Sequence, residues 1–468
     1  MATRQYKPRF YRLALPLLSS IVCSTAYAVD FGTSVIYQYE SSDNIDRVDQ
    51  NAEPDDGSRH SVEASLNAST RATQLDMDFD LNLLFSEDSG ADGDSTSTDA
   101  RGGIYALYNI RPGQISWLFA DYVVQQGEDL ESLSNADERF LANYFVTGPS
   151  TSWRITPVDS INLDLFYLLA DEESSDEQTR QLALQTDWSH RFSRQHTVGL
   201  HFDRSDITYK ETDDEFSIVN TYGRYGYEQG KMRFNLDVGK SSTDEESADA
   251  ISGNTVASTT DEDLFRVGFT RQMSRELSLN FGASQVFTDE TFSTIRDLQS
   301  NLSNGVSTGS GPFYEKRVAL GINRGDSIWN ATLNVSNTDV EFVDDVSQID
   351  DRGTQQLSLE LGYSLSSRWG LRASVGQSEI DYSNIDRFDE ELDYSFGASY
   401  QVAVSWGIAL DASYSMVESN RPNDTTGTQE QVDIEENNVS LSIIWSPQTK
   451  LSRLREKYER KQIENVLQ

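Results

Sequence analysis

A strict alternation of apolar and polar residues over positions 75–85 constrains this chain more than any other feature. The segment reads LDMDFDLNLLF, with apolar residues at odd positions, beginning Leu75, Met77 and Phe79, and with Asp76, Asp78, Asp80 and Asn82 at even positions. Successive side chains of a β-strand point to opposite faces of the sheet. The segment therefore predicts a strand with one apolar face and one strongly polar face.

Similar alternating segments recur along the whole chain. They include INLDLFYLL from residue 161, KMRFNLDV from 231, LSLNFGAS from 277, WNATLNVS from 329, LSLELGYS from 357 and VSLSIIW from 439. Each is about 9 to 13 residues long, the length that a tilted strand needs to cross a bilayer.

The connections between these segments alternate between short and long. Short turns are predicted near residues 71–73, 111–113, 156–160, 193–195, 229–231, 273–276, 325–327, 366–368 and 402–405. Long loops are predicted near 41–58, 87–99, 127–137, 171–178, 209–214, 244–262, 289–312, 340–353, 382–390 and 418–431. This pattern predicts an all-β fold over residues 29–446, a transmembrane antiparallel up-and-down β-barrel of about 20 strands with both ends in the periplasm.

The first 28 residues have the order of a secretory signal peptide: basic residues, an apolar run from Leu13 to Cys23, and the ending Ala26-Tyr27-Ala28. Cleavage there removes the only cysteine, so disulfides are excluded. Because a strand starts almost at once after this site, we expect no N-terminal plug domain and no coupling segment of an energised transporter. No later stretch has the roughly 18 to 20 consecutive apolar residues of a membrane-spanning helix.

The composition excludes further classes of protein. The formal net charge is −38, and nucleic acid is excluded as a partner because phosphate binding needs a basic surface. An acidic disordered or secreted chain is the alternative, since only 37% of residues are hydrophobic. Against it, 21 Tyr, 21 Phe and 7 Trp are too many aromatic residues for a disordered chain.

The tryptophans supply an independent test of the strand register. All seven lie near a predicted short turn or the end of the last strand: Trp117, Trp153, Trp188, Trp329, Trp369, Trp406 and Trp445. Aromatic side chains favour the interface of a membrane, where the ring is buried and the polar group stays wet. We therefore predict an interfacial girdle on the periplasmic side; the alternative is a set of scattered core tryptophans in a soluble sandwich.

The polar faces of the strands predict the lining of the lumen. Candidate lumen residues come from two of the alternating segments: Asp76, Asp78, Asp80, Asn82, Arg233, Asn235 and Asp237. Leu75, Met77 and Phe79 are expected to face lipid.

No pattern in the sequence indicates catalysis, a cofactor or a metal site. The histidines are His60, His190, His196 and His201, and the last two have opposite parity along one predicted strand, which opposes convergence on a metal. No nucleophile with a positioned base is apparent. The sequence predicts a protein that is not an enzyme.

The predicted external loops are rich in Asp and Glu, as in residues 43–56, 171–177 and 244–246. Simple solubility explains this acidity; the alternatives are divalent-cation bridges to lipopolysaccharide phosphates and repulsion of anionic solutes. The expected partners are outer-membrane lipid, lipopolysaccharide and the barrel-assembly machinery.

Residues 447–468 form a charged segment after the last strand. Leu451, Leu454, Tyr458 and Ile463 are spaced for one helical face, so a short periplasmic helix is predicted. The alternatives for it are docking of a partner, closure of the lower mouth, and a solvated tail.

The start of the predicted mature chain, FGTSVIYQYESSDNIDR, is followed by Glu53-Pro54 and then HSVEASLNAST. It resembles the opening of the beta-barrel porin 2 family, in which the first strand ends in a "DN-apolar-x-R" element, here residues 43–47. Members of that family often lie in exopolysaccharide loci. The resemblance implies an outer-membrane pore for exopolysaccharide, with periplasmic export components and the polysaccharide as partners.

Three functions remain open at this point. The first is export of an exopolysaccharide through a wide pore lined by acidic residues. The second is a general or cation-selective diffusion porin, because lumen carboxylates favour cations in both cases. The third is a structural or adhesive barrel without transport.

Overall fold

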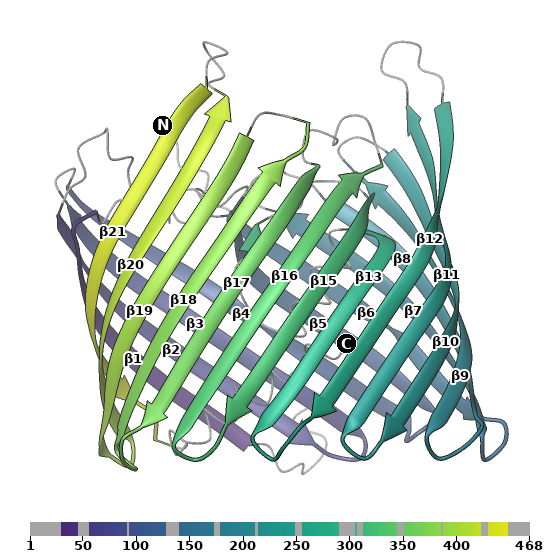
Figure 1. Cartoon of the computed structure of the whole chain (residues 1–468), viewed down its shortest axis with the longest axis horizontal. Coiled ribbons are helices and arrows are strands. Elements are labelled where there is room, and N and C mark those ends of the chain that lie inside the picture. Colours follow the sequence, from purple (N-terminus) through teal and green to yellow (C-terminus); the bar gives the residue numbers. More distant parts are fainter. Residues whose placement is uncertain are drawn as a thin grey trace.

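The structure is a closed β-barrel whose strands run obliquely around a central lumen (Figure 1). This computed structural model describes residues 30–44, 56–90, 93–127, 140–172, 178–210, 214–248, 255–289, 305–306, 312–343, 351–384, 387–422 and 429–447. Within these ranges twenty strands form the closed wall, and one further short strand, β14 (Gly305–Val306), pairs with the end of one wall strand without being part of the closed ring. The prediction of an antiparallel barrel of 20 strands is confirmed.

The wall strands follow one another around the barrel in chain order. They are β1 (Asp30–Ser42), β2 (Gly57–Arg71), β3 (Leu75–Gly90), β4 (Gly93–Arg111), β5 (Ile115–Gly127), β6 (Phe140–Arg154), β7 (Asp159–Glu172), β8 (Gln178–Arg191), β9 (His196–Tyr209), β10 (Asp214–Gln229), β11 (Met232–Ala248), β12 (Thr255–Gln272), β13 (Leu277–Asp289), β15 (Pro312–Gly325), β16 (Trp329–Phe342), β17 (Arg352–Ser364), β18 (Trp369–Tyr382), β19 (Arg387–Ala403), β20 (Trp406–Pro422) and β21 (Gln429–Trp445). Neighbouring strands pair antiparallel, and β13 pairs directly with β15.

The first and last strands pair with each other and close the sheet. Their antiparallel register joins Val35 to Trp445 and Ser42 to Asn438. Closure matters because hydrocarbon offers no hydrogen-bond partner to an open sheet edge. The two ends of the wall thus satisfy each other's backbone groups.

The seam between β1 and β21 is fastened at its upper end by side chains of the Asp43-Asn44 pair. The carboxylate of Asp43 accepts hydrogen bonds from the backbone N–H of Asn437 at 2.7 Å and from its side-chain amide at 2.8 Å. The amide of buried Asn44 donates to the carbonyl oxygen of Glu435 at 3.0 Å. These two residues therefore lock the barrel shut where the first loop begins.

The two faces of the wall differ in polarity. In the pair β16–β17, Leu333 lies opposite Leu359 on one face, and Asn334 lies opposite Ser358 on the other. The face with leucine carries large exposed apolar side chains all around the barrel. An apolar outer surface with a polar inner one is the arrangement of a barrel that spans a membrane.

Five of the short turns at one end of the barrel share the same hydrogen-bond pattern. The carboxylate of Asp326 accepts the backbone N–H groups of Ile328 at 2.6 Å and Trp329 at 2.9 Å. The Trp329 N–H, and after it that of Ile328, lowers the pKa of the Asp326 carboxyl. Hydroxyls accept bonds from the same two following positions in four other turns, at Thr156, Ser193, Ser274 and Ser366. A short side chain with an oxygen atom at this position accepts hydrogen bonds from turn N–H groups that have no partner strand.

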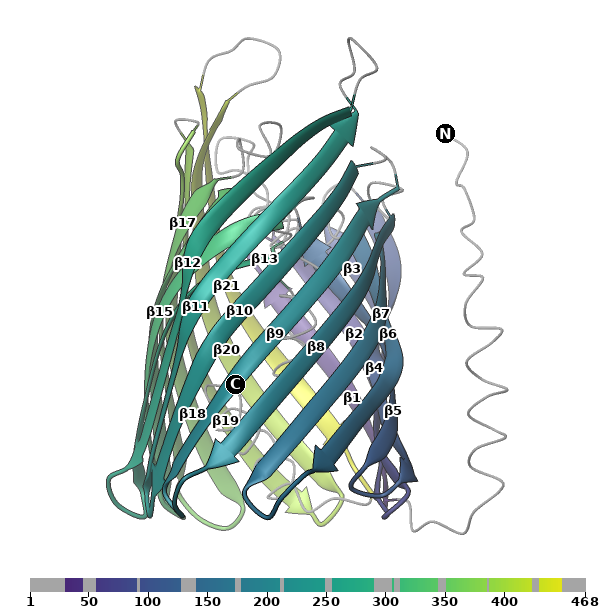
Figure 2. The same cartoon turned by 90° about the vertical axis from the view of Figure 1, so that its right-hand side faces the viewer.

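The strands extend further on the long-loop side than the sequence predicts. The wall strands have 13 to 19 residues, and they occupy much of the predicted loops 87–99, 244–262 and 418–431. The upper parts of β11 and β12 stand above the neighbouring strands (Figure 2). The predicted strand length of about 9 to 13 residues was wrong because it relied on apolar alternation. Above the apolar band, the outer face carries ion pairs such as Arg204–Asp206 and Lys240–Asp263, so the alternation disappears while the strand pairing continues.

Two expectations fall on residues outside the described ranges. They are the signal peptide of residues 1–28 and, apart from its first residue, the helical tail of residues 447–468. Among the described residues, no helix is long and apolar enough to cross a membrane.

An arginine substitution on each face of β17 tests which face meets lipid. We expect Leu359→Arg to lower the free energy of unfolding by about 2–4 kcal/mol, because a guanidinium would enter the hydrocarbon layer. Ser358→Arg places the same group toward the lumen and should leave stability nearly unchanged. The measurement is the urea midpoint for refolding into lipid vesicles. Equal losses for the two variants would contradict the assigned faces.

Candidate functional site

The seven predicted lumen residues all lie on the inner face of the wall, in two separate groups. Asp76 and Asp78 of β3 form ion pairs with Arg71, with N–O distances of 2.6 Å and 2.5 Å. Asp80 and Asn82 follow on the same face. On β11 the inner face carries Arg233, Asn235 and Asp237. The β3 and β11 groups stand on different parts of the wall, so they do not form one site.

The seven tryptophans all point to the outer face, next to the short turns or the last strand end. They are Trp117, Trp153, Trp188, Trp329, Trp369, Trp406 and Trp445. Trp406 and Trp445 face each other across β20–β21, with ring centroids 6.5 Å apart. At this level of the wall an indole can bury its ring in the apolar band and keep its N–H near water.

Arginine–aspartate pairs recur around the inner face. Arg59 meets Asp88 with two hydrogen bonds, at 2.6 Å and 2.9 Å. The guanidinium of Arg372 lies 2.7 Å from the Asp411 carboxylate, and that of Arg387 lies 2.9 Å from buried Asp389. Two-pronged contacts of this kind fix the guanidinium plane and neutralise both charges. Much of the charge on the wall is therefore held in matched pairs.

A connected group of polar side chains on the inner face is centred on Tyr222 of β10. The Tyr222 hydroxyl accepts hydrogen bonds from Arg224 at 3.0 Å and from Arg266 at 3.2 Å. Arg224 also binds both carboxylate oxygens of Asp237, at 3.0 Å and 3.2 Å. His201 stacks on the Tyr222 ring at 4.4 Å between centroids. We call these five residues the Tyr222 cluster.

Only His201 among the four histidines lies on the inner face. Its Nδ1 is 2.6 Å from Asp187 and its Nε2 is 3.1 Å from Asp203. Each ring nitrogen of His201 thus contacts a carboxylate, one on the neighbouring strand β8 and one on the same strand β9. Among the described residues, no group of three or more His, Cys, Asp or Glu side chains is arranged to hold a metal ion.

A file of hydroxyl and amide side chains runs along β16 on the inner face. Its members alternate with outward apolar residues and are Asn330, Thr332, Asn334, Ser336 and Thr338. The next strand continues the polar surface with Thr354, Gln356 and Ser358 opposite them. No apolar side chain interrupts the five positions on β16. We call this surface the β16 file.

An apolar patch lies on the inner face of β5–β8, which the sequence analysis did not predict. Buried residues on it include Leu118, Tyr122, Tyr144, Val146 and Leu168. They share a face with Asp78 and Asp80, because Tyr122 lies opposite Gly103, which in turn lies opposite Asp80. The signal was present as the nearly continuous apolar runs ISWLFADYVV and FLANYFV, since strands buried on both faces lose their alternation.

The upper ends of β13 and β15 turn inward from the wall. Pairing of β13 with β12 ends at Gln285, and the N–H of Phe287 then donates to the inner hydroxyl of Ser241 at 3.2 Å. Phe287 and Tyr314 pack on inner apolar residues of β9 and β10, namely Ile207, Tyr209, Phe216 and Ile218. The hairpin of β13 and β15 therefore occupies part of the outer mouth.

Strand β14, which follows β13 in the chain, reaches a distant part of the wall. Gly305 and Val306 pair in parallel with Gln126 and Gly127 at the long-loop end of β5. β5 stands across the barrel from β13 and β15 in the strand order. The connection between β13 and β15 thus touches both sides of the outer mouth.

Comparisons with known proteins agree on the fold and go no further. No family model matches the sequence, and no curated protein matches it. The copper transporter OprC is similar in structure, with 12% identity, a TM-score of 0.47, and 89% of this chain and 80% of that chain covered. The FrpB iron transporter from Neisseria meningitidis has 9% identity and a TM-score of 0.45, with 89% of this chain and 82% of that chain covered. The unliganded ferric citrate transporter FecA has 10% identity and a TM-score of 0.47, with 90% of this chain and 79% of that chain covered. At these values we take neither a solute nor a mechanism from them.

The closed sheet, its apolar outer face and its polar inner face define an outer-membrane β-barrel. The site to be explained is the lumen, with a polar half around β16, the Tyr222 cluster and an apolar patch on β5–β8. The resemblance to the beta-barrel porin 2 family stays a prediction.

Breaking one inner-wall ion pair tests whether the Tyr222 cluster stabilises the barrel. We expect Asp237→Asn to lower the free energy of unfolding by about 1–3 kcal/mol, because Arg224 loses its charged, buried partner and one of its two hydrogen bonds to it. The matched control is Asp263→Asn, which removes the partner of Lys240 on the exposed outer face and should cost about 0–1 kcal/mol. Urea midpoints in lipid vesicles measure both. A larger loss for the control would contradict a stabilising role of the cluster.

Proposed function

We propose that this barrel is a passive pore for small hydrophilic solutes in the outer membrane. The β16 file is the observation that supports this proposal most. Hydroxyl and amide groups both donate and accept hydrogen bonds, so they replace the water around a polar solute at each step of its passage. Water can replace the same bonds, so the solute binds weakly and leaves again. No catalytic step is part of the proposal.

The shape of the outer mouth favours small solutes over a polymer. The inward hairpin of β13 and β15 and the contact of β14 with β5 occupy space that a wide pore would leave open. A small solute passes beside this obstruction along the polar half of the wall. A polysaccharide chain needs a continuous clear channel.

Export of an exopolysaccharide is the second candidate function. The β16 file also favours it, because a row of hydroxyl and amide groups along the wall suits the hydroxyl groups of a sugar polymer. In that case periplasmic export components and the polymer itself would be the partners.

Conductance in planar lipid bilayers tests the pore. We expect the purified barrel to give stepwise ion currents, with a reversal potential in a KCl gradient that favours K⁺, because the protein carries a formal charge of −38. Absence of any current from a folded barrel would contradict both transport functions and favour a structural or adhesive barrel. Heat-modifiable migration on gels provides the control for folding.

A deletion strain separates the two transport functions. If the barrel is a diffusion pore, we expect slower uptake of small hydrophilic solutes and normal surface polysaccharide. Retention of polymer in the periplasm, or loss of the surface matrix, would instead support export and contradict the first proposal. Complementation with the wild-type gene is the control for effects on neighbouring genes.

A further inference from the structure

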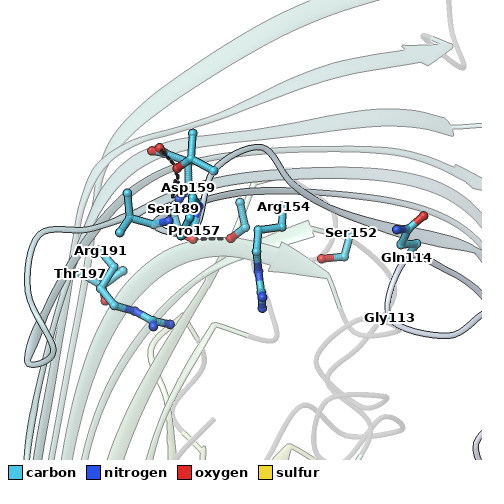
Figure 3. A pocket seen from close by; sticks show the side chains of 12 residues that line it. Gly113, Gln114, Ser152, Arg154, Pro157, Asp159, Ser189, Arg191 and Thr197 are labelled. Carbon is cyan, nitrogen blue, oxygen red and sulfur yellow. Dashed lines mark hydrogen bonds between the residues drawn. The ribbon is translucent and has the colours of Figure 1, made fainter.

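A hollow of about 520 Å³ lies at the short-turn end of the barrel, under the ends of β6 and β8. Two arginines and several hydroxyl or amide groups line it, among them Gln114, Ser152, Arg154, Ser189, Arg191 and Thr197. Figure 3 shows both arginine side chains extending to the same side of the β6–β7 turn, into the barrel. Arg154 and Arg191 end their strands, with β7 between them.

The charges of Arg154 and Arg191 are not neutralised, whereas those of several other inner arginines are. Arg59, Arg372 and Arg387 each bind a carboxylate within hydrogen-bond distance. Within the described ranges, neither Arg154 nor Arg191 forms an ion pair or a side-chain hydrogen bond, although the protein is strongly acidic. Two guanidinium groups without a carboxylate partner therefore line the same hollow in a strongly acidic chain.

One carboxylate borders the hollow, and it is engaged elsewhere. Asp159 lies 2.5 Å from the hydroxyl of Thr156 and 2.7 Å from Nδ1 of His190. Its side chain points away from both arginines in Figure 3. The hollow therefore presents two positive groups to the lumen with no carboxylate turned toward them.

We propose that this hollow binds the oxyanion group of a hydroxyl-bearing solute, such as a phosphorylated or carboxylated sugar. Each guanidinium offers paired N–H donors in the plane that suits a phosphate or carboxylate. The hydroxyls of Ser152, Ser189 and Thr197 and the amide of Gln114 line the same hollow and offer hydrogen bonds to the remaining polar groups of the solute. Binding is weak and reversible, because both guanidinium groups are exposed to water.

This inference deepens the proposed pore by naming a solute class at its periplasmic end. It rests on the pore only for the route by which a solute arrives. Binding at the hollow does not require conduction, so the two proposals can fail separately.

The test uses the full barrel in detergent and compares glucose 6-phosphate with glucose, which differ only by the phosphate. Saturation-transfer NMR measures binding of each sugar without any need for current. The variant is Arg154→Gln with Arg191→Gln. The matched control is Arg180→Gln with Arg204→Gln, which removes the same charge from the outer faces of β8 and β9. Heat-modifiable migration shows that every variant is folded.

We expect glucose 6-phosphate to bind the wild type and the control, and to bind the Arg154/Arg191 variant about tenfold more weakly, because two charge-assisted contacts are lost. Glucose should bind none of them measurably. Displacement of glucose 6-phosphate by inorganic phosphate would support recognition of the oxyanion.

Two results would overturn the inference. One is equal binding of glucose and glucose 6-phosphate to the wild type. The other is the same loss of binding in the outer-face control as in the Arg154/Arg191 variant. A barrel that binds glucose 6-phosphate as expected but carries no current would instead reject the pore and leave the hollow standing.

Discussion

Everything in this molecule depends on the requirement that backbone hydrogen bonds be satisfied inside a membrane. A strand in hydrocarbon has no water to accept its N–H and C=O groups, so an open sheet is excluded and the chain must return to its own first strand. The pairing of Val35 with Trp445 meets this requirement. Once the sheet is closed, each residue can face only lipid or lumen, and the alternating sequence then assigns every side chain to one of them.

The lumen that results is divided by chemistry. Along β16 itself the inner face carries uncharged hydroxyl and amide groups, whereas the Tyr222 cluster and the arginine–aspartate pairs hold charge in fixed, matched contacts. Pairing keeps these charges from attracting every passing ion strongly. The apolar patch that includes Tyr122 and Tyr144 lies against neither lipid nor open water, since both residues are buried. One side of the lumen can therefore contact hydrated solutes, and the other side packs apolar side chains against one another.

The sequence was sufficient to predict those parts of the fold that depend on the local pattern of apolar and polar residues. The alternation over 75–85 was enough to predict the face of Asp76 and Leu75, and the short breaks between alternating segments were enough to place the short turns. It failed above the apolar band, where strands such as β11 persist through pairing with a neighbour and leave no periodic signal. It also failed for Tyr122, which lies on the inner face and packs with apolar residues of β6 and β7, because the prediction assumed that every inner face is polar. The hollow at Arg154 and Arg191 was missed because the two residues are far apart in sequence and each looks like an ordinary strand end.

The lock at the seam has a consequence for the order in which the chain assembles. Every other strand pair in the wall joins neighbours in sequence, so it can form as soon as a hairpin is complete, but Asp43 and Asn437 are separated by 394 positions. Contacts of such long sequence separation carry the highest entropic cost of closure and form late. Until Asp43 meets Asn437, the growing sheet has two unpaired edges that can join a second chain as easily as each other. The contacts of Asp43 and Asn44 with β21 therefore exist only in the closed barrel, and they distinguish it from an incomplete sheet.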